Sequence, residues 1–69
     1  KSISQLSQAK PEDKDLLGHL LLTAHKIANE KGIGDGYRVI INNGEKGGQT
    51  VFHLHVHLIG GRQLNWPNL

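Results

Sequence analysis

The sequence contains no cysteine, so disulfide bonds and metal sites built from thiolates are excluded. No apolar run is long enough to span a membrane, and no signal peptide is visible. The net charge is only +2 with neutral histidines, and the lysines are scattered singly instead of forming a stripe. The sequence therefore gives no support for a membrane partner or for a nucleic-acid-binding surface.

The chain is also short, and its 69 residues form one small domain at most. A domain of this size buries only about 60% of the surface that its unfolded chain exposes, so its stability alone would be marginal. Without disulfides, histidine ligation or oligomerisation could supplement it. The chain opens on Lys1 without a methionine, which is consistent with a trimmed part of a longer protein. What stands out in its composition is five histidines and nine glycines.

One long helix is predicted over residues 12–31. Glu12 and Asp13 stand where a helix N-terminus favours negative charge, and Gly32 stands where a left-handed residue would end the helix. Gly18 inside this helix costs about 1 kcal/mol relative to alanine, so we expect close packing on another element there. Apolar residues recur at helical spacing and form one stripe: Leu16, Leu17, Leu20, Leu21, Ala24, Ile27 and Ala28.

Two β-rich segments follow, Tyr37–Asn42 and Val51–Ile59. The glycine run at 32–36 has no strand before it and no helix after it, so it is interpreted as a connector and not as a dinucleotide-binding loop. Residues 43–49 have turn chemistry, which predicts an antiparallel hairpin. The expected fold is α+β, an antiparallel sheet with the long helix across one face.

The second β-rich segment carries three alternating histidines, His53, His55 and His57. Successive side chains of a strand point to opposite faces, so the three imidazoles should share one face at a spacing of about 6.5–7 Å. The opposite face should be apolar and pack on the helix stripe; it consists of Phe52, Leu54, Val56 and Leu58.

Three explanations of the histidine face compete. A solvated face that happens to be rich in histidine is disfavoured, because every position holds the residue that changes charge near neutral pH. A zinc site is possible for two histidines two residues apart, but Asp35 and Glu45, the nearby acidic residues, lie in loops. A phosphate-transfer site is the third, in which the middle ring attacks phosphorus. The segment before the strand favours it, because residues 47–50 (GGQT) offer backbone N–H groups, an amide and a hydroxyl to phosphate oxygens, and Asn42 could add a hydrogen bond.

The run His53–Ile59 resembles the signature of the histidine-triad (HIT) superfamily, His-φ-His-φ-His-φ-φ, with every position filled. Residues 17–20 (LGHL), 36–38 (GYR) and the tail 60–67 (GGRQLNWP) resemble the histidine triad nucleotide-binding protein (Hint) branch. The resemblance implies that residues 1–69 are the C-terminal part of a single HIT domain, whose N-terminal base-binding strands are absent from this chain.

The resemblance also implies roles for individual residues. His55 matches the nucleophile that forms a covalent nucleotidyl-histidine, His57 the ring near the α-phosphate and the departing group, and His53 the residue that orients the nucleophile. Trp66 matches the tail residue that reaches the partner subunit's site. The positions that contact ribose and phosphate are Asn42, Gly48, Gln49 and Thr50.

Two positions depart from the pattern of the family. Thr50 stands where serine is expected; it keeps the hydroxyl and adds a stiff β-branch. Ser2 stands where Hint proteins commonly have a further histidine at the edge of the site. The first change leaves the expected chemistry intact, whereas the second puts that contact in doubt.

The function that the resemblance implies is hydrolysis of a purine nucleoside phosphoramidate by a homodimer whose two sheets join across a two-fold axis. His57 occupies a place where family transferases carry glutamine, which favours hydrolysis over transfer. No metal or cofactor is needed in this scheme, and the partners are a purine nucleotide and a second subunit. The expected location is the cytoplasm or nucleus, with a mitochondrial location left open. The alternative is a non-catalytic nucleotide- or metal-binding regulatory protein that acts through its dimer surface.

Overall fold

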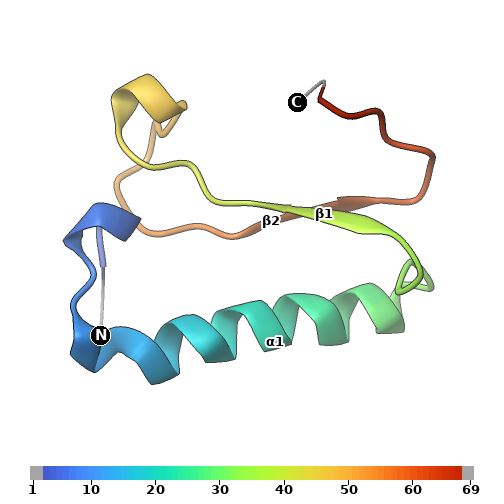
Figure 1. Ribbon diagram of the computed structural model, residues 1–69, viewed down its shortest axis with the longest axis horizontal. Helices are drawn as coiled ribbons and strands as arrows, with labels where there is room; N and C mark the ends of the chain where they lie inside the picture. The colour runs from blue at the N-terminus through green and yellow to red at the C-terminus, as the bar shows by residue number, and fades with distance from the viewer. Residues whose placement is uncertain (1–2, 68–69) are drawn as a thin grey trace.

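The computed structural model describes residues 3–67 as one long helix beside a two-stranded hairpin. Short 3-10 turns at Leu6–Gln8 (η1) and Pro11–Asp13 (η2) lead into helix α1, Lys14–Glu30. Strand β1, Tyr37–Ile40, is followed by the 3-10 turn Glu45–Gly47 (η3) and by strand β2, His57–Gly60. Figure 1 shows α1 running along the hairpin. The predicted α+β architecture is confirmed for this chain.

Helix α1 begins and ends where the sequence predicts, within two residues. Before it, the Lys10 backbone N–H donates to a carboxylate oxygen of Asp13 at 2.9 Å, and Asp13 is buried. After it, Gly32 adopts a φ of 78°, which reverses the chain. The Ile33 N–H then donates to the carbonyl of Ala28 at 2.9 Å, so an otherwise unpaired helix carbonyl is satisfied.

The hairpin is antiparallel as predicted, but its strands are shorter than predicted. Tyr37 pairs with Gly60 and Ile40 with His57, and the ladder ends there. The prediction of a continuous strand over Val51–Ile59 is therefore wrong for residues 51–56, and β1 stops two residues before Asn42.

The N-terminal segment forms a hydrogen bond with each arm of the hairpin beyond the paired strands. The Ser7 N–H donates to the side-chain oxygen of Asn43 at 2.7 Å, on the arm that follows β1. The Leu54 N–H donates to the carbonyl of Ile3 at 2.7 Å, on the arm that precedes β2. Both arms are thus bonded to this third segment, and the ladder between the strands ends at Ile40 and His57.

The core lies between α1 and the hairpin and is small. Ala24 and Ala28 of α1 are buried there, but Leu21 and Ile27 of the predicted stripe are 49% and 41% exposed. The prediction of close packing at Gly18 is wrong, because a Cβ added there would meet nothing within 4 Å. Among residues 3–67, no helix combines the length and the apolar character that crossing a bilayer requires.

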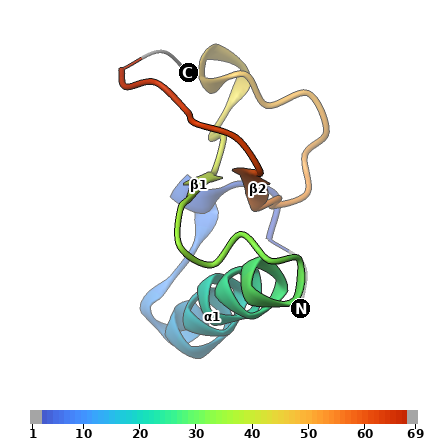
Figure 2. The same cartoon turned by 90° about the vertical axis from the view of Figure 1, so that its right-hand side faces the viewer.

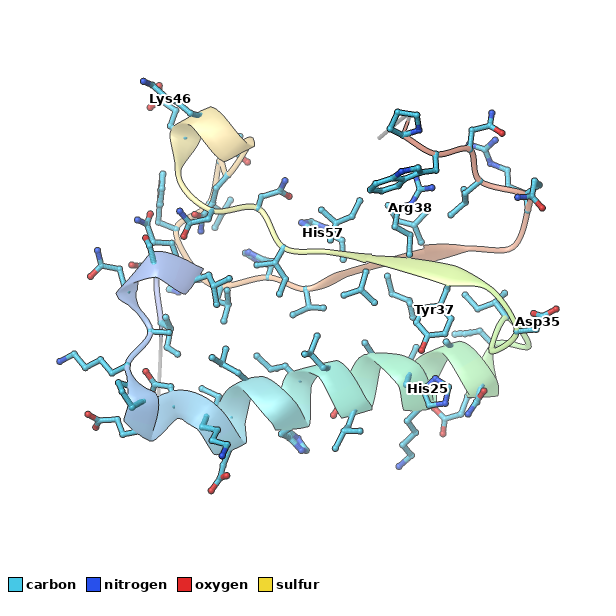
Figure 3. All side chains as sticks on the ribbon, in the orientation of Figure 1. His25, Asp35, Tyr37, Arg38, Lys46 and His57 are labelled. Carbon is cyan, nitrogen blue, oxygen red and sulfur yellow. The ribbon has the colours of Figure 1, made fainter. Side chains whose placement is uncertain are left out.

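The face of the hairpin away from α1 carries the C-terminal tail. In Figure 2 the strands lie between α1 on one side and both the tail and the η3 loop on the other. Tyr37 points toward α1, where its hydroxyl oxygen lies 2.6 Å from Nδ1 of His25. Arg38 and His57 point the other way (Figure 3). The histidine face is therefore the face opposite the helix.

Candidate active site

The histidine segment keeps its predicted alternation even where it is not a regular strand. His53, His55 and His57 are exposed, whereas Leu54, Val56 and Leu58, which alternate with them, are partly buried. Phe52 departs from the prediction because the chain bends at residues 51–53, which leaves this ring 47% exposed instead of packed on the helix.

The His55 and His57 rings form a pair. Their centroids are 6.3 Å apart and their planes differ by 26°, close to the spacing expected of alternate residues on one face. Among residues 3–67, neither ring makes a hydrogen bond within the chain, so their nitrogens are available to a ligand.

Both rings line an open cavity of about 220 Å³. Its other walls come from the end of β1 and from the segment that follows η3. The residues lining it are Asn42, Gly48, Gln49, Thr50, Val51, His55 and His57. The structure thus brings together most of the residues singled out from the sequence. They come from a stretch of the chain that runs from position 42 to position 57.

The remaining candidates lie elsewhere. His53 and Trp66 do not line this cavity, and Ser2 is outside the described residues. Val51 lines it without having been predicted, and only its place directly after Thr50 could have indicated this. The roles assigned to all of these residues stay predictions.

The glycine-rich loop differs from the predicted phosphate cradle. The N–H groups of Gly47 and Gln49 both donate to the carbonyl of Gly44, at 3.1 and 3.0 Å, and that of Gly48 donates to Glu45 at 3.0 Å. These three backbone donors hold the η3 turn together. Thr50 makes no hydrogen bond within residues 3–67, so its N–H and hydroxyl are the donors that this loop leaves available.

Asn42 and Gln49 are also engaged inside the loop. The Asn42 side-chain amide donates to the carbonyl of Gly47 at 2.8 Å, which leaves its oxygen for a ligand. Gln49 is only 6% exposed, and its amide bonds to three backbone groups. Gln49 therefore lines the cavity as part of its wall.

The tail is anchored to β1 by Arg38. The guanidinium donates to the carbonyl of Asn65 at 2.6 Å, and its Cζ lies 5.9 Å from the centre of the Trp66 ring. The Trp66 side chain is 79% exposed. The sequence motif that contains Arg38 was recognised, but nothing in it indicated this contact.

The described residues, 3–67, contain no group of three or more histidine, aspartate or glutamate side chains that could hold a metal ion. The residues lining the cavity instead carry several separate polar groups, namely the imidazoles of His55 and His57, the hydroxyl and N–H of Thr50, and the amide oxygen of Asn42. Such an arrangement suits an elongated anionic ligand better than a single ion.

This chain is similar to known proteins over nearly its whole length. The family model described as HIT domain matches residues 1–64. An uncharacterized HIT-like protein of Synechocystis is 60% identical over 97% of this chain and 59% of its own length. Adenylylsulfatase HINT1 of Arabidopsis thaliana is 51% identical over 94% of this chain and 44% of its own length.

Solved structures that are similar to this chain are also HIT or histidine triad proteins. A HIT family hydrolase from Legionella pneumophila superposes with a TM-score of 0.93 at 41% identity, over 97% of this chain and 61% of that one. A histidine triad protein from Clostridium difficile gives a TM-score of 0.85 at 39% identity, over 94% and 57%. The chain therefore spans between 44% and 61% of the length of these relatives.

Proposed function

The chain belongs to the HIT domain family, and from this premise we propose that it is the catalytic part of a purine nucleoside phosphoramidate hydrolase. The observation that carries the proposal is that the neighbouring rings of His55 and His57, with centroids 6.3 Å apart, line the same cavity as Thr50. A histidine nucleophile beside hydrogen-bond donors for a phosphoryl group is the minimum that such chemistry needs.

The proposed reaction has two steps. In the first, a ring nitrogen of His55 attacks the α-phosphorus, a bond forms between them, and the bond from phosphorus to the amine breaks. The amine leaves with a proton, and the neighbouring His57 ring is the group proposed to donate it. In the second, water attacks phosphorus, the bond to His55 breaks, and the nucleoside monophosphate is released.

A covalent intermediate can be tested directly on the complete protein. An adenosine 5′-phosphoramidate labelled with ³²P at phosphorus should leave label on the protein after rapid denaturation at alkaline pH, where the phosphorus–nitrogen bond of a nucleotidyl-histidine survives. His55→Ala should abolish the label, and His19→Ala, at an exposed position on α1, is the matched control. Label at the wild-type level in His55→Ala would exclude His55 as nucleophile. Absence of both label and turnover in the wild-type protein would favour the non-catalytic regulatory alternative.

A second candidate substrate comes from a relative. The Arabidopsis protein named adenylylsulfatase is 51% identical to this chain. Attack of His55 on the phosphorus of adenylyl sulfate would break the bond from phosphorus to the bridging oxygen and release sulfate, so the same residues would serve. Comparison of kcat/KM for adenylyl sulfate and for adenosine phosphoramidates decides between the two leaving groups.

We also propose that the complete protein is a homodimer. Large apolar side chains remain exposed in this small domain, including Leu22 at 73%. Burial of such surface against other protein would supply stability that a core of this size lacks. Sedimentation equilibrium of the complete protein measures the mass; a monomer at micromolar concentration would contradict the dimer.

A further inference from the structure

Gln49 is one of two buried polar residues among those described, and its amide connects three separate stretches of backbone. Its Oε1 accepts a hydrogen bond from the Gly44 N–H at 2.8 Å, where the loop begins. Its Nε2 donates to the carbonyl of Val51 at 3.2 Å, where the loop ends, and to the carbonyl of Ser4 at 2.6 Å in the N-terminal segment.

These bonds occupy both amide hydrogens of Gln49. A ligand could use them only by breaking the part-buried hydrogen bond to the carbonyl of Ser4 or Val51, which would cost the stability that this bond contributes. The backbone N–H of Gln49 is also bonded, to the carbonyl of Gly44 at 3.0 Å. Direct contact between Gln49 and a ligand is therefore unfavourable, although this residue lines the cavity.

The next residue along the chain remains available to a ligand. Thr50 follows Gln49 directly, is exposed, and makes no hydrogen bond within residues 3–67. The bonds of Gln49 to Gly44 and Val51 fix the backbone on both sides of Thr50. Binding and catalytic groups work only when their own supports hold them to within about 0.5 Å of the productive geometry.

We propose that Gln49 is a positioning residue, which holds the Thr50 N–H and hydroxyl toward the phosphate without itself touching the substrate. The proposal rests on the proposed function, because it needs a phosphate in the cavity. It differs from the role in substrate contact that family resemblance suggests for this position.

The first test compares two ligands of the complete protein, adenosine 5′-monophosphate and adenosine. Gln49→Met keeps the length of the side chain and removes the amide. It should weaken monophosphate binding about tenfold or more, the factor for one lost hydrogen bond to a charged group. Adenosine binding should stay within about twofold, since it has no phosphate for Thr50 to contact. Gln8→Met, at an exposed glutamine, is the control and should change neither affinity.

Equal weakening of both ligands would show general loss of structure and overturn the proposal, as would no change in either. If the wild-type protein bound the monophosphate no more tightly than adenosine, the nucleotide site itself would be wrong, and this failure is separate from that of Gln49. Gln49→Glu, which keeps the acceptor for Gly44 and loses both donors, is a second variant. If neither variant folded while Gln8→Met did, the role of Gln49 would be structural and the proposal overturned.

The second test asks whether Gln49 acts through Thr50. When one residue works only through another, the double variant loses little more than the single variant. Gln49→Met combined with Thr50→Val should therefore bind the monophosphate within about twofold of Thr50→Val alone. Losses that multiply would show that Gln49 contacts the ligand independently and would contradict the proposal.

Discussion

Replacing Thr50 with valine should lower kcat/KM of the complete protein for an adenosine phosphoramidate, whereas replacing it with serine should not. Valine has nearly the shape of threonine and lacks only the hydroxyl. A hydrogen bond to a charged group contributes about 1.5–3 kcal/mol, which corresponds to a loss of roughly 10- to 150-fold. Serine retains the hydroxyl, so its variant should keep activity within about 0.5 kcal/mol, or roughly twofold.

The structure makes the two variants comparable. Thr50 is exposed and makes no hydrogen bond within residues 3–67, so neither change removes an internal contact. Both should therefore leave the free energy of unfolding within about 0.5 kcal/mol of the wild-type value. The assay is steady-state kinetics of all three proteins, with thermal denaturation as the check on folding. Equal kcat/KM for the serine and valine variants would refute contact between this hydroxyl and the phosphate.

Three further predictions concern the same site. His55→Ala should abolish turnover and leave nucleotide binding largely intact, as measured by kinetics and calorimetry. Residual activity above about a hundredth would indicate a general base or a bystander, since general acid–base roles contribute ~10²–10⁴-fold. Truncation before Arg62 should change the order of preference among amine leaving groups more than it changes the melting temperature, because it removes the exposed Trp66. A uniform loss of activity for all amines would instead indicate that the tail only covers the sheet. Exhaustive chelation should leave activity unchanged, because three histidine rings spread along an extended segment cannot all place a nitrogen ~2.0–2.1 Å from one zinc ion. A loss of activity that added zinc restores would establish a metal site.

Helix α1 could be predicted because its signals are local. The acidic residues before it, the apolar spacing within it and the left-handed Gly32 after it act over a few positions each. The pairing of β1 with β2 was predicted for the same reason, from two β-rich segments and turn residues between them. Alternation also gave the correct face for His55 and His57.

What the sequence did not predict depends on contacts between distant residues. The hairpin ladder stops at Ile40 and His57, and its arms bond to Ser7 and Ile3 beyond that point; no periodic pattern in the sequence records this. The burial of Gln49 is equally invisible, since its partner Ser4 is 45 positions away. A glutamine in a glycine-rich loop looks like a ligand contact until its hydrogen bonds are known.

The docking of the N-terminal segment has a kinetic consequence. Its bonds to Asn43, Gln49 and Leu54 close loops of 36 to about 50 residues, whereas α1 and the β1–β2 pair form through closer contacts. Contacts of large sequence separation form late, because chain entropy opposes them until closer contacts have formed. The wall of the cavity around Gln49 should therefore be among the last parts of this chain to become ordered during folding. By the same reasoning it should be among the first to open, so amide hydrogens of residues 44–51 would exchange before those of α1.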